Sequence, residues 1–459
     1  MTAPSASIAG HQVDRSNLPL LFTLGLGVFA GALDLGVLAP AIPALSAAFH
    51  IPTGDLAWVY TLYLLVTIVS ITITTKLADQ YGRRPVYIAC VTTFALGSLL
   101  AIVSPSYGIF LLARALQAFG AGGIFPVATA AIGDVVPLER RGSALGLIGA
   151  TWGLAAVIGP NVGGIVTHAL SWHWIFAAII PLALVVIALA RRYVPVNAMR
   201  ARGPLDVQGL SALSVGLAAL MLGLATSRYY LLLITAATSI AFYAAERGAK
   251  APIFSPLLFA NAQLMKAYGL EVIIGLLEGA LFFIPASLIA AQHLSAVAAG
   301  AIAGMGAIIF VAVIPLSGRA LDTFGSRPVL TAGASLTTIG LIFYALYFDA
   351  LWPAMIGIGL AGVGFGSLLG APTRYIVTNE APNHLRATAI GLLSQCLIIG
   401  QIVGGSLAGA IVRHQSNLVS GFRDSYEIFA LFGVVGIAVT FTLKAAPAER
   451  SSKASGFAG

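Results

Sequence analysis

The chain contains one short polar stretch twice: it reads DQYGRRPV at residues 79–86 and DTFGSRPV at residues 322–329. A second stretch follows each copy, reading RGSALGL at residues 141–147 and RATAIGL at residues 386–392. The two offsets are 243 residues (322 − 79) and 245 residues (386 − 141). Because both matches keep their order at nearly one offset, we predict two halves with the same fold in parallel orientation.

The rest of the sequence is strongly apolar. Of the 459 residues, 59% are hydrophobic and 9% are charged, and the mean hydropathy is +0.96. Soluble domains carry about 25% charged residues, so this chain has too few charges to cover a surface that faces water. The 51 glycines suit membrane helices that pack closely through small residues. We therefore predict an all-α polytopic membrane protein that contacts the lipid bilayer.

Membrane spans are predicted from apolar runs of about 20 residues, the length that crosses a bilayer as a helix. The repeat assigns six spans to each half and leaves two inserted central helices, which makes fourteen transmembrane helices; the alternative is twelve, with the two central helices at the interface. The predicted domains are an N-terminal six-helix bundle at 1–194, a linker with the two extra helices at 195–260, and a C-terminal six-helix bundle with a short tail at 261–459. The predicted spans cover residues 20–46, 56–78, 86–105, 108–133, 142–167, 173–193, 206–225, 228–245, 266–290, 297–317, 328–347, 351–373, 386–413 and 427–445.

The basic residues set the predicted orientation, because cytoplasmic loops carry an excess of Lys and Arg. With the N-terminus inside, most Lys and Arg residues between the spans fall in predicted cytoplasmic loops and tails. Only Arg228, Arg413 and Arg423 fall on the outer side of the membrane. The first apolar run is too long for a signal-peptide core and is predicted to be a retained span. We expect a multi-pass protein of the cell (inner or plasma) membrane with both termini in the cytoplasm.

Several function classes are disfavoured by the sequence. The net charge of +8 arises from basic residues in short loops, which indicates membrane topology rather than a nucleic-acid partner. Cys90 and Cys396 lie inside apolar runs, and no Cys or His spacing suits a metal. No phosphate-binding loop of the Gly-Lys-Ser/Thr kind and no catalytic set is apparent, which disfavours an ATP-driven pump and an enzyme. We expect no cofactor, no metal and a monomer.

Two acidic residues occupy matching places in the two halves. Asp34 lies near the middle of the first predicted span, and Glu278 lies 244 residues later in the first span of the second half. A charge in the middle of a span costs at least about 2.5–3.5 kcal/mol, so an acid there is a functional candidate by default. We expect both acids to face one central cavity, as proton carriers or as counter-charges for a cationic substrate; the alternative for Asp34 is a neutral side chain bonded to a neighbouring helix.

Two further charged residues lie inside predicted spans. Glu271 is two helical turns before Glu278 on nearly the same face, where it takes part in transport or pairs locally with Lys266. Arg114 lies about two turns into the fourth predicted span and needs an acidic or carbonyl partner, in the cavity or on another helix.

The repeated polar stretches form short cytoplasmic turns, in which glycine allows a tight bend and an acid can interact with the N-terminus of a neighbouring helix. Such contacts can form in one conformation and break in another, which predicts a cytoplasmic gate; the alternative is topology plus local ion pairs. A second ion-pair set is expected among Glu139, Arg140, Arg141, Arg374, Glu380 and Arg386. The candidate gate residues are Asp79, Gly82, Arg83, Arg84, Asp322, Gly325, Arg327, Glu139, Arg141 and Arg386.

The fifth predicted span is rich in small residues. Proline removes a helix hydrogen bond and kinks the helix, and glycines let a neighbouring helix approach closely. A kinked, closely packed helix suits two halves that rock against each other, although ordinary small-residue packing is the alternative. The residues concerned are Gly153, Gly159, Pro160, Gly163 and Gly164.

These motifs resemble those of the major facilitator superfamily, and more narrowly its fourteen-span drug:proton antiporter branch. The resemblance covers nearly the whole chain but departs from the family pattern at Gly36, Ala39 and Thr75. It implies that Arg114 assists proton transfer at Asp34 and that the fifth span carries the antiporter motif. The matching residues are Leu33-Asp34 with Ala41-Ile42-Pro43, Leu77-Ala78-Asp79 with Gly82-Arg83-Arg84, Arg114, Gln117 and Gly120, Gly153 to Gly164, and Trp172 to Phe176.

The expected function is proton-coupled secondary transport by alternating access, which the resemblance implies, with export of an amphipathic or cationic small molecule. The spans offer many apolar side chains and few polar anchors, which also permits export of a lipid or glycolipid. Uptake of a polar nutrient would require more Asn, Gln and charged residues in the spans than this chain has. A channel or scaffold without coupling is disfavoured by the matching acids.

Overall fold

The computed structural model describes residues 17–51, 57–196, 207–225, 228, 230–248, 255–281, 283–415 and 417–444, and every regular element among them is a helix. The first group comprises α1 (Leu18–Leu38), η1 (Ala39–Ala41), α2 (Ile42–Phe49), α3 (Ala57–Tyr81), α4 (Arg83–Ile102), α5 (Tyr107–Val135), α6 (Leu138–Ala169), α7 (His173–Ala177) and α8 (Ile179–Tyr193). Two helices follow, α9 (Val207–Ala225) and α10 (Leu231–Gly248). The second group comprises α11 (Pro256–Ala260), α12 (Ala262–Leu281), α13 (Ile284–Gln292), α14 (Ala296–Phe324), α15 (Ser326–Tyr347), α16 (Leu351–Leu369), α17 (Pro372–Glu380), η2 (Asn383–Leu385), α18 (Arg386–His414) and α19 (Leu418–Phe441).

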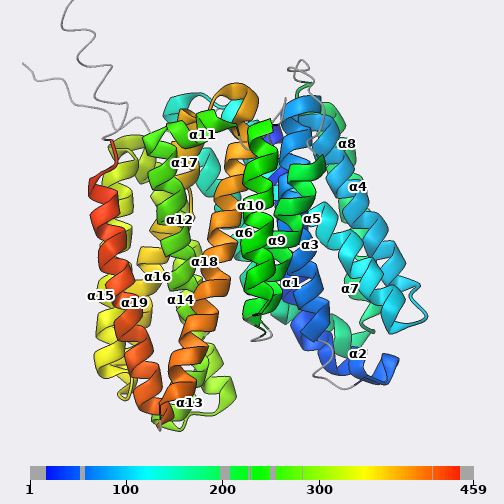
Figure 1. Cartoon of the computed structure of the whole chain (residues 1–459). Helices are drawn as coiled ribbons and strands as arrows, with labels where there is room; N and C mark the ends of the chain where they lie inside the picture. Colours follow the sequence, from blue (N-terminus) through cyan, green and yellow to red (C-terminus); the bar gives the residue numbers. More distant parts are fainter. Residues whose placement is uncertain are drawn as a thin grey trace, which may run out of the picture.

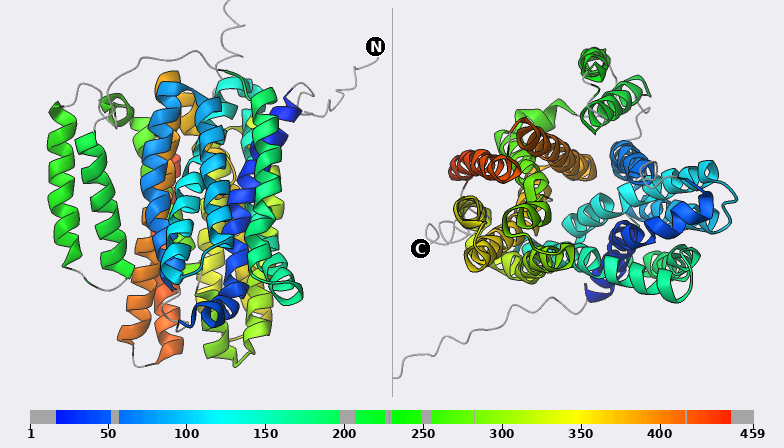
Figure 2. Two further views of the ribbon diagram at one scale, coloured as in Figure 1. Left: turned by 90° about the vertical axis from the view of Figure 1, so that its right-hand side faces the viewer. Right: turned by 90° about the horizontal axis from the view of Figure 1, so that it is seen from below.

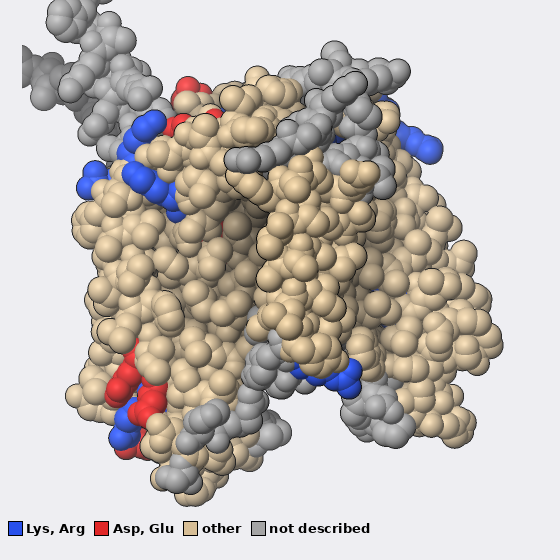
Figure 3. Space-filling view, viewed as in Figure 1, with Lys and Arg blue, Asp and Glu red and all other residues tan. Residues whose placement is uncertain are grey.

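Twelve segments of the described chain are long and apolar enough to cross a membrane, from Leu18–Leu38 to Leu418–Phe441. They confirm a multi-pass helical membrane protein. In α9 and α10 the apolar stretches are shorter, Ser211–Leu220 and Leu231–Ala245, so fourteen spans stay a prediction. Charged side chains gather near the two ends of the face in Figure 3. Large apolar side chains such as Leu112 and Leu431 are more than 60% exposed, as lipid-facing residues are.

The long helices stand side by side in two groups, α1–α8 and α12–α19 (Figure 1). The helices α9 and α10 form a separate pair beside them, and α9 contacts both α3 and α18 (Figure 2). The two groups meet along two seams, where α6 packs on α14 and α3 packs on α18. We refer to the groups as the N-half and the C-half.

The same backbone turns recur at the repeat offset. Gly82 between α3 and α4 has φ = 95°, and Gly325 between α14 and α15 has φ = 81°. Residues with a side chain rarely adopt a backbone conformation in this left-handed region, so glycine is required at both turns. Among the described non-glycine residues, His50 and His293 alone have positive φ, and they end α2 and α13. The chain thus turns in the same way at corresponding points.

Close helix packing also recurs, and it gives the register between the halves. A methyl group on Gly97 would lie 2.5 Å from the Gln117 nitrogen, and one on Gly340 would lie 2.5 Å from the Ala361 nitrogen. The α4–α5 contact therefore matches the α15–α16 contact, with residue 117 corresponding to residue 361.

A second pair of contacts relates α3 to α14. A methyl group on Gly122 would lie 2.8 Å from the Thr67 carbonyl oxygen, and one on Gly366 would lie 2.6 Å from the Phe310 carbonyl oxygen. The offset is therefore 244 residues from α5 to α16 (361 − 117) and 243 residues from α3 to α14 (310 − 67).

The glycine-rich helix α6 runs unbroken from Leu138 to Ala169 and packs on both halves. A methyl group on Gly153 would lie 2.9 Å from Val311 on α14, and one on Gly159 would lie 2.8 Å from Gly36 on α1. The backbone of Pro160 lies in this helix, but its side chain is outside the described residues. Small residues thus bring α6 close to α1 and α14, while their role in rocking stays a prediction.

We expect Gly163→Ala to destabilise the protein and Gly164→Ala to be nearly neutral. A methyl group on Gly163 would lie 2.1 Å from the Val37 carbonyl oxygen, which forces α6 away from α1, whereas one on Gly164 would be 3.8 Å from Pro40. Overpacking of this kind costs about 1–3 kcal/mol. Thermal unfolding of both purified variants in the same detergent measures the difference. Equal unfolding temperatures would contradict the packing.

Candidate functional site

Asp34 lies in a buried polar cluster inside the N-half. The Arg114 Nη1 donates to Asp34 Oδ2 at 2.8 Å, and both side chains are fully buried. The Gln117 Nε2 donates to Asp34 Oδ1 at 3.3 Å and to the Ser98 hydroxyl at 2.8 Å. The Arg114 guanidinium carbon lies 4.4 Å from the centre of the Tyr63 ring. We call Asp34, Tyr63, Arg114 and Gln117 the N-half cluster, in which the arginine neutralises the acid.

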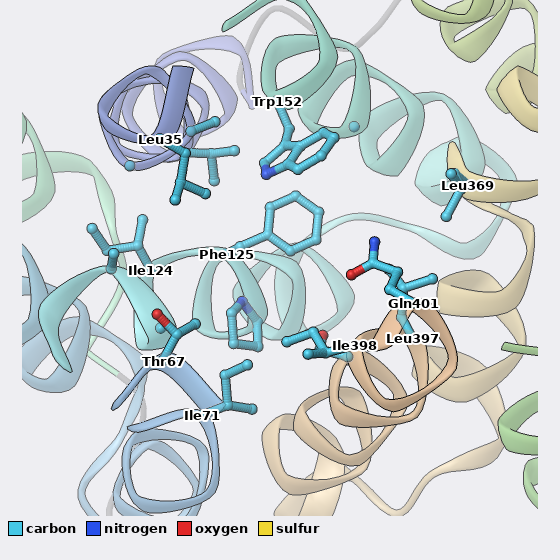
Figure 4. Close-up of a pocket in the computed structure, with 18 of the residues that line it drawn as sticks. Leu35, Thr67, Ile71, Ile124, Phe125, Trp152, Leu369, Leu397, Ile398 and Gln401 are labelled. Atoms are coloured by element: carbon cyan, nitrogen blue, oxygen red, sulfur yellow. The ribbon is translucent and has the colours of Figure 1, made fainter. Parts of the chain in front are cut away.

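A central cavity of about 210 Å³ lies between the two halves (Figure 4). Leu35, Phe125 and Trp152 line it from the N-half, and Leu397 and Gln401 line it from the C-half. Its lining is mostly apolar, so it suits a hydrophobic or amphipathic molecule better than a sugar.

Glu278 and Arg374 are the charged residues that line this cavity in the described chain. The expectation that Asp34 and Glu278 both face the cavity is corrected, because Arg114 and Gln117 enclose Asp34. Neither acid faces lipid: Asp34 is buried, and Glu278 faces the cavity.

Glu278 has an amide partner rather than a basic one. The Gln401 Nε2 donates to Glu278 Oε2 at 2.9 Å, and no ion pair to Glu278 is found in the described parts of the chain. The Arg374 Nη1 donates to the Leu369 carbonyl oxygen at 2.7 Å, and its guanidinium carbon lies 4.7 Å from the Phe125 ring centre. Glu278 therefore has capacity to bind a positively charged group.

Glu271 is fully buried in the C-half, and neither carboxyl oxygen has a hydrogen-bond partner among the described residues. It interacts electrostatically with Arg374 and Glu278. The alternative of a local pair with Lys266 is wrong, because the Lys266 ammonium instead donates to the Thr442 carbonyl oxygen at 2.7 Å.

A cluster around Asp79 joins the halves at one end of the molecule. Asp79 accepts hydrogen bonds from the backbone nitrogens of Ala387 and Thr388, at 3.0 and 2.7 Å, and from the Thr388 hydroxyl at 2.6 Å. These donors lie in the first turn of α18, where the helix dipole favours a carboxylate. Arg83 also donates to Asp79. We call this arrangement the first clamp.

The first clamp extends to Asp134, at the end of α5. The Arg83 Nε donates to Asp134 Oδ2 at 3.0 Å, and Arg386 donates to Asp134 Oδ1. Asp134 was not among the predicted gate residues. The signal that could have found it is an acid at the end of an apolar run, close in sequence to the second repeated stretch. Two arginines and two acids thus link α3, α4, α5 and α18.

A second clamp lies at the corresponding place around Asp322. Its carboxylate accepts from the backbone nitrogens of Gly142 and Ser143, at 2.7 and 2.8 Å, and from the Ser143 hydroxyl. Arg141 donates to Asn379. Asn379 stands 245 residues after Asp134, so the acid that the first clamp uses is an amide here.

The other predicted gate residues do not connect the halves. Arg84 donates to the Arg191 carbonyl oxygen, within the N-half. Arg327 lies over the Phe441 ring, with 5.9 Å from its guanidinium carbon to the ring centre. Both arginines thus make these contacts within their own half.

The residues of the expected second ion-pair set do not gather in one cluster. Arg374 lines the cavity, Glu380 accepts from the Asn261 amide at 3.1 Å, and Arg386 belongs to the first clamp. Glu139 interacts electrostatically with Arg141. These residues are divided among α6, α17 and α18, and the sequence of the loops does not reveal how those helices are positioned.

Comparisons with known proteins agree with this fold. A sequence model described as Major Facilitator Superfamily matches residues 24–292 and 272–458. The chain is similar to an uncharacterized MFS-type transporter of Bacillus subtilis (strain 168), YfiU, with 31% identity over 412 residues, covering 85% of this chain and 79% of that protein. It is also similar to the multidrug resistance protein B homolog of Mycobacterium tuberculosis (strain ATCC 25618 / H37Rv), with 28% identity over 430 residues, covering 88% of this chain and 78% of that protein.

A solved structure shares the fold. The crystal structure of the human organic anion transporter MFSD10 superposes with a TM-score of 0.71 at 14% identity, covering 93% of this chain and 100% of that one. Members of the matching family are transporters of small molecules, and the prediction of a transporter is confirmed at this level. Because the family model matches most of the sequence and a relative is 31% identical over 85% of this chain, the chain belongs to the Major Facilitator Superfamily.

Proposed function

We propose that this protein is a proton-coupled secondary transporter that exports amphipathic or cationic small molecules by alternating access. The observation that carries this proposal is Glu278, an acid that forms no ion pair among the described residues and lies on a cavity with a mostly apolar lining. An acid at that place can hold either a proton or a cationic substrate, and exchange between the two is the basis of antiport. The name of the mycobacterial relative, multidrug resistance protein B homolog, supports the same class.

In this proposal the candidate residues have the roles that were predicted from the sequence. Asp34, Glu271, Glu278 and Arg114 are proton-coupling or substrate-binding residues, and the two clamps form the gate. Both clamps lie at the end of the molecule that also holds the start of α1 and the end of α19 (Figure 1). If this end is cytoplasmic, the described conformation is closed to the cytoplasm, and breaking the clamps opens the cavity to the inside.

The topology follows from the same proposal. We propose fourteen spans, with α9 and α10 as the two central ones, in the inner or plasma membrane with both termini cytoplasmic. The bundles are assigned to residues 1–194 and 261–459, with 195–260 between them, and the protein acts as a monomer. A lipid or glycolipid exporter is the second candidate, because the apolar lining of the cavity also suits acyl chains.

The decisive test is transport of tetraphenylphosphonium in proteoliposomes. An imposed gradient supplies about 2.3 kcal/mol per charge per 100 mV, so we expect the native protein to accumulate the cation when a pH gradient is imposed. Glu278→Gln is expected to abolish this accumulation, whereas Glu380→Gln, which changes an acid that does not line the cavity, is expected to keep it.

Two results would contradict the proposal. Equal uptake by native protein with and without the gradient would show that transport is not coupled to protons. Full gradient-driven uptake by Glu278→Gln would show that this acid carries neither proton nor substrate. If native protein moves no cation but moves a fluorescent lipid, the lipid-export candidate replaces drug export.

A further inference from the structure

A second cavity of about 230 Å³ extends from the central cavity into the C-half. It lies between α12, α14 and α16, and it shares Glu278, Phe310 and Leu369 with the central cavity. Apart from Glu278, its lining in the described chain is apolar, with small residues such as Ala303 and Ala307 on α14. We call it the C-half chamber.

The C-half chamber occupies the place where the N-half holds its polar cluster. Applying the register between the helices, Tyr63 corresponds to Gly306, Arg114 to Ile358 and Gln117 to Ala361. All three C-half counterparts line the chamber. Asp34 corresponds to Glu278, 244 residues later. The second half has therefore kept the acid and replaced its aromatic, cationic and amide partners with small or apolar residues.

This replacement leaves an open space beside Glu278 and an excess negative charge in the C-half. In the N-half the Arg114 guanidinium fills the space beside Asp34, 2.8 Å from the carboxylate and 4.4 Å from the Tyr63 ring centre. In the C-half the corresponding space is open, and the Gln401 amide is the hydrogen-bond partner of Glu278. Among the described residues, Arg374 is the one arginine that interacts with Glu271 and Glu278, so the ionised site has one negative charge in excess.

We propose that the C-half chamber binds an organic cation, whose charged group pairs with Glu278 in the position that the Arg114 guanidinium takes in the N-half. The apolar part of the ligand lies in the chamber against Ile358 and Phe365, and the Phe310 ring faces both cavities. A cation over an aromatic ring gains further attraction. This inference rests on the proposed function and narrows its substrate to a lipophilic monocation.

The test restores the missing guanidinium. Purified protein is titrated with tritiated tetraphenylphosphonium in a scintillation-proximity binding assay without any gradient. In Ile358→Arg the introduced side chain occupies the chamber and neutralises Glu278, so the affinity is expected to fall by about tenfold or more. Ile358→Met, which is long but uncharged, is the matched control and is expected to stay near native affinity.

A second pair of variants covers the case in which Ile358→Arg does not fold. Ala307 and Ala301 are both exposed residues of α14, but only Ala307 lines the chamber. Ala307→Phe is expected to weaken binding by about tenfold through lost space, and Ala301→Phe is expected to have no effect. Native affinity in a folded Ile358→Arg or Ala307→Phe protein overturns the proposal.

The outcome is independent of the transport test. If tetraphenylphosphonium binds to the native protein and both chamber variants lose this binding, the chamber is the binding site even where no proton-driven transport occurs. In that case only the proposal of proton coupling is wrong. If gradient-driven transport is found but the chamber variants bind and carry the cation normally, the transporter proposal stands and the chamber is not its binding site.

Discussion

Replacing Arg114 with methionine is expected to lower the stability of the protein by about 3–5 kcal/mol. The guanidinium neutralises Asp34 where both side chains are fully buried. Without it, the Asp34 carboxylate would have the Gln117 amide at 3.3 Å but no counter-charge in the N-half cluster. A buried charge without a counter-charge is among the most destabilising changes that a single substitution can make.

Asp34→Asn/Arg114→Met removes both charges together and is expected to recover a large part of the loss, because the cost lies in leaving one charge unpaired. Unfolding of native protein, both single variants and the double variant in mixed detergent micelles gives the coupling energy by a double-mutant cycle. Strictly additive losses would show that Asp34 and Arg114 are not energetically paired.

Asp79→Asn is expected to open the clamped end of the molecule. Asp79 accepts two backbone hydrogen bonds and one hydroxyl hydrogen bond from α18 and is bonded by Arg83. Hydrogen bonds to a charged group contribute about 1.5–3 kcal/mol each, so a loss of about 2 kcal/mol shifts the ratio of closed to open molecules by about thirtyfold. Electron-electron double resonance between labels at Tyr81→Cys and Phe324→Cys measures the opening, since both side chains are exposed on opposite halves.

The matched control is Asp322→Asn in the second clamp. Its effect is expected to be smaller, because Asn379 stands where the first clamp has Asp134, and Ser326 follows the turn where the first clamp has Arg83. Both experiments use a background in which Cys90 and Cys396 are replaced. Equal label distances in Asp79→Asn and native protein would exclude the clamp as a gate.

The same difference between the two clamps predicts that one substitution can stabilise the closed conformation. Asn379→Asp would give Arg141 the charged partner that Arg386 has in Asp134. We expect the closed population to rise and gradient-driven transport to slow, because the gate must break for each cycle. The double resonance measurement on the same label pair follows the first effect. A lower closed population would contradict the inference.

Much of the architecture could be read from the sequence because hydropathy and internal repetition are local properties. The apolar runs, the Asp-Gly-Arg turns at Gly82 and Gly325, and the matching acids all appear as patterns along the chain. Candidate residues at the site were found because a charge inside an apolar run is costly, which makes Asp34, Arg114 and Glu278 conspicuous.

What the sequence by itself determined is the class of protein: a membrane-spanning chain of two related halves, with acids inside its spans. The tertiary structure decided which of these charges meet. It enclosed Asp34 with Arg114 and Gln117, placed Glu278 and Arg374 on the cavity, and joined Asp134 to two arginines. The physical reason is that pairing depends on the distances between side chains of separate helices, and helix packing sets those distances while periodicity along one helix does not.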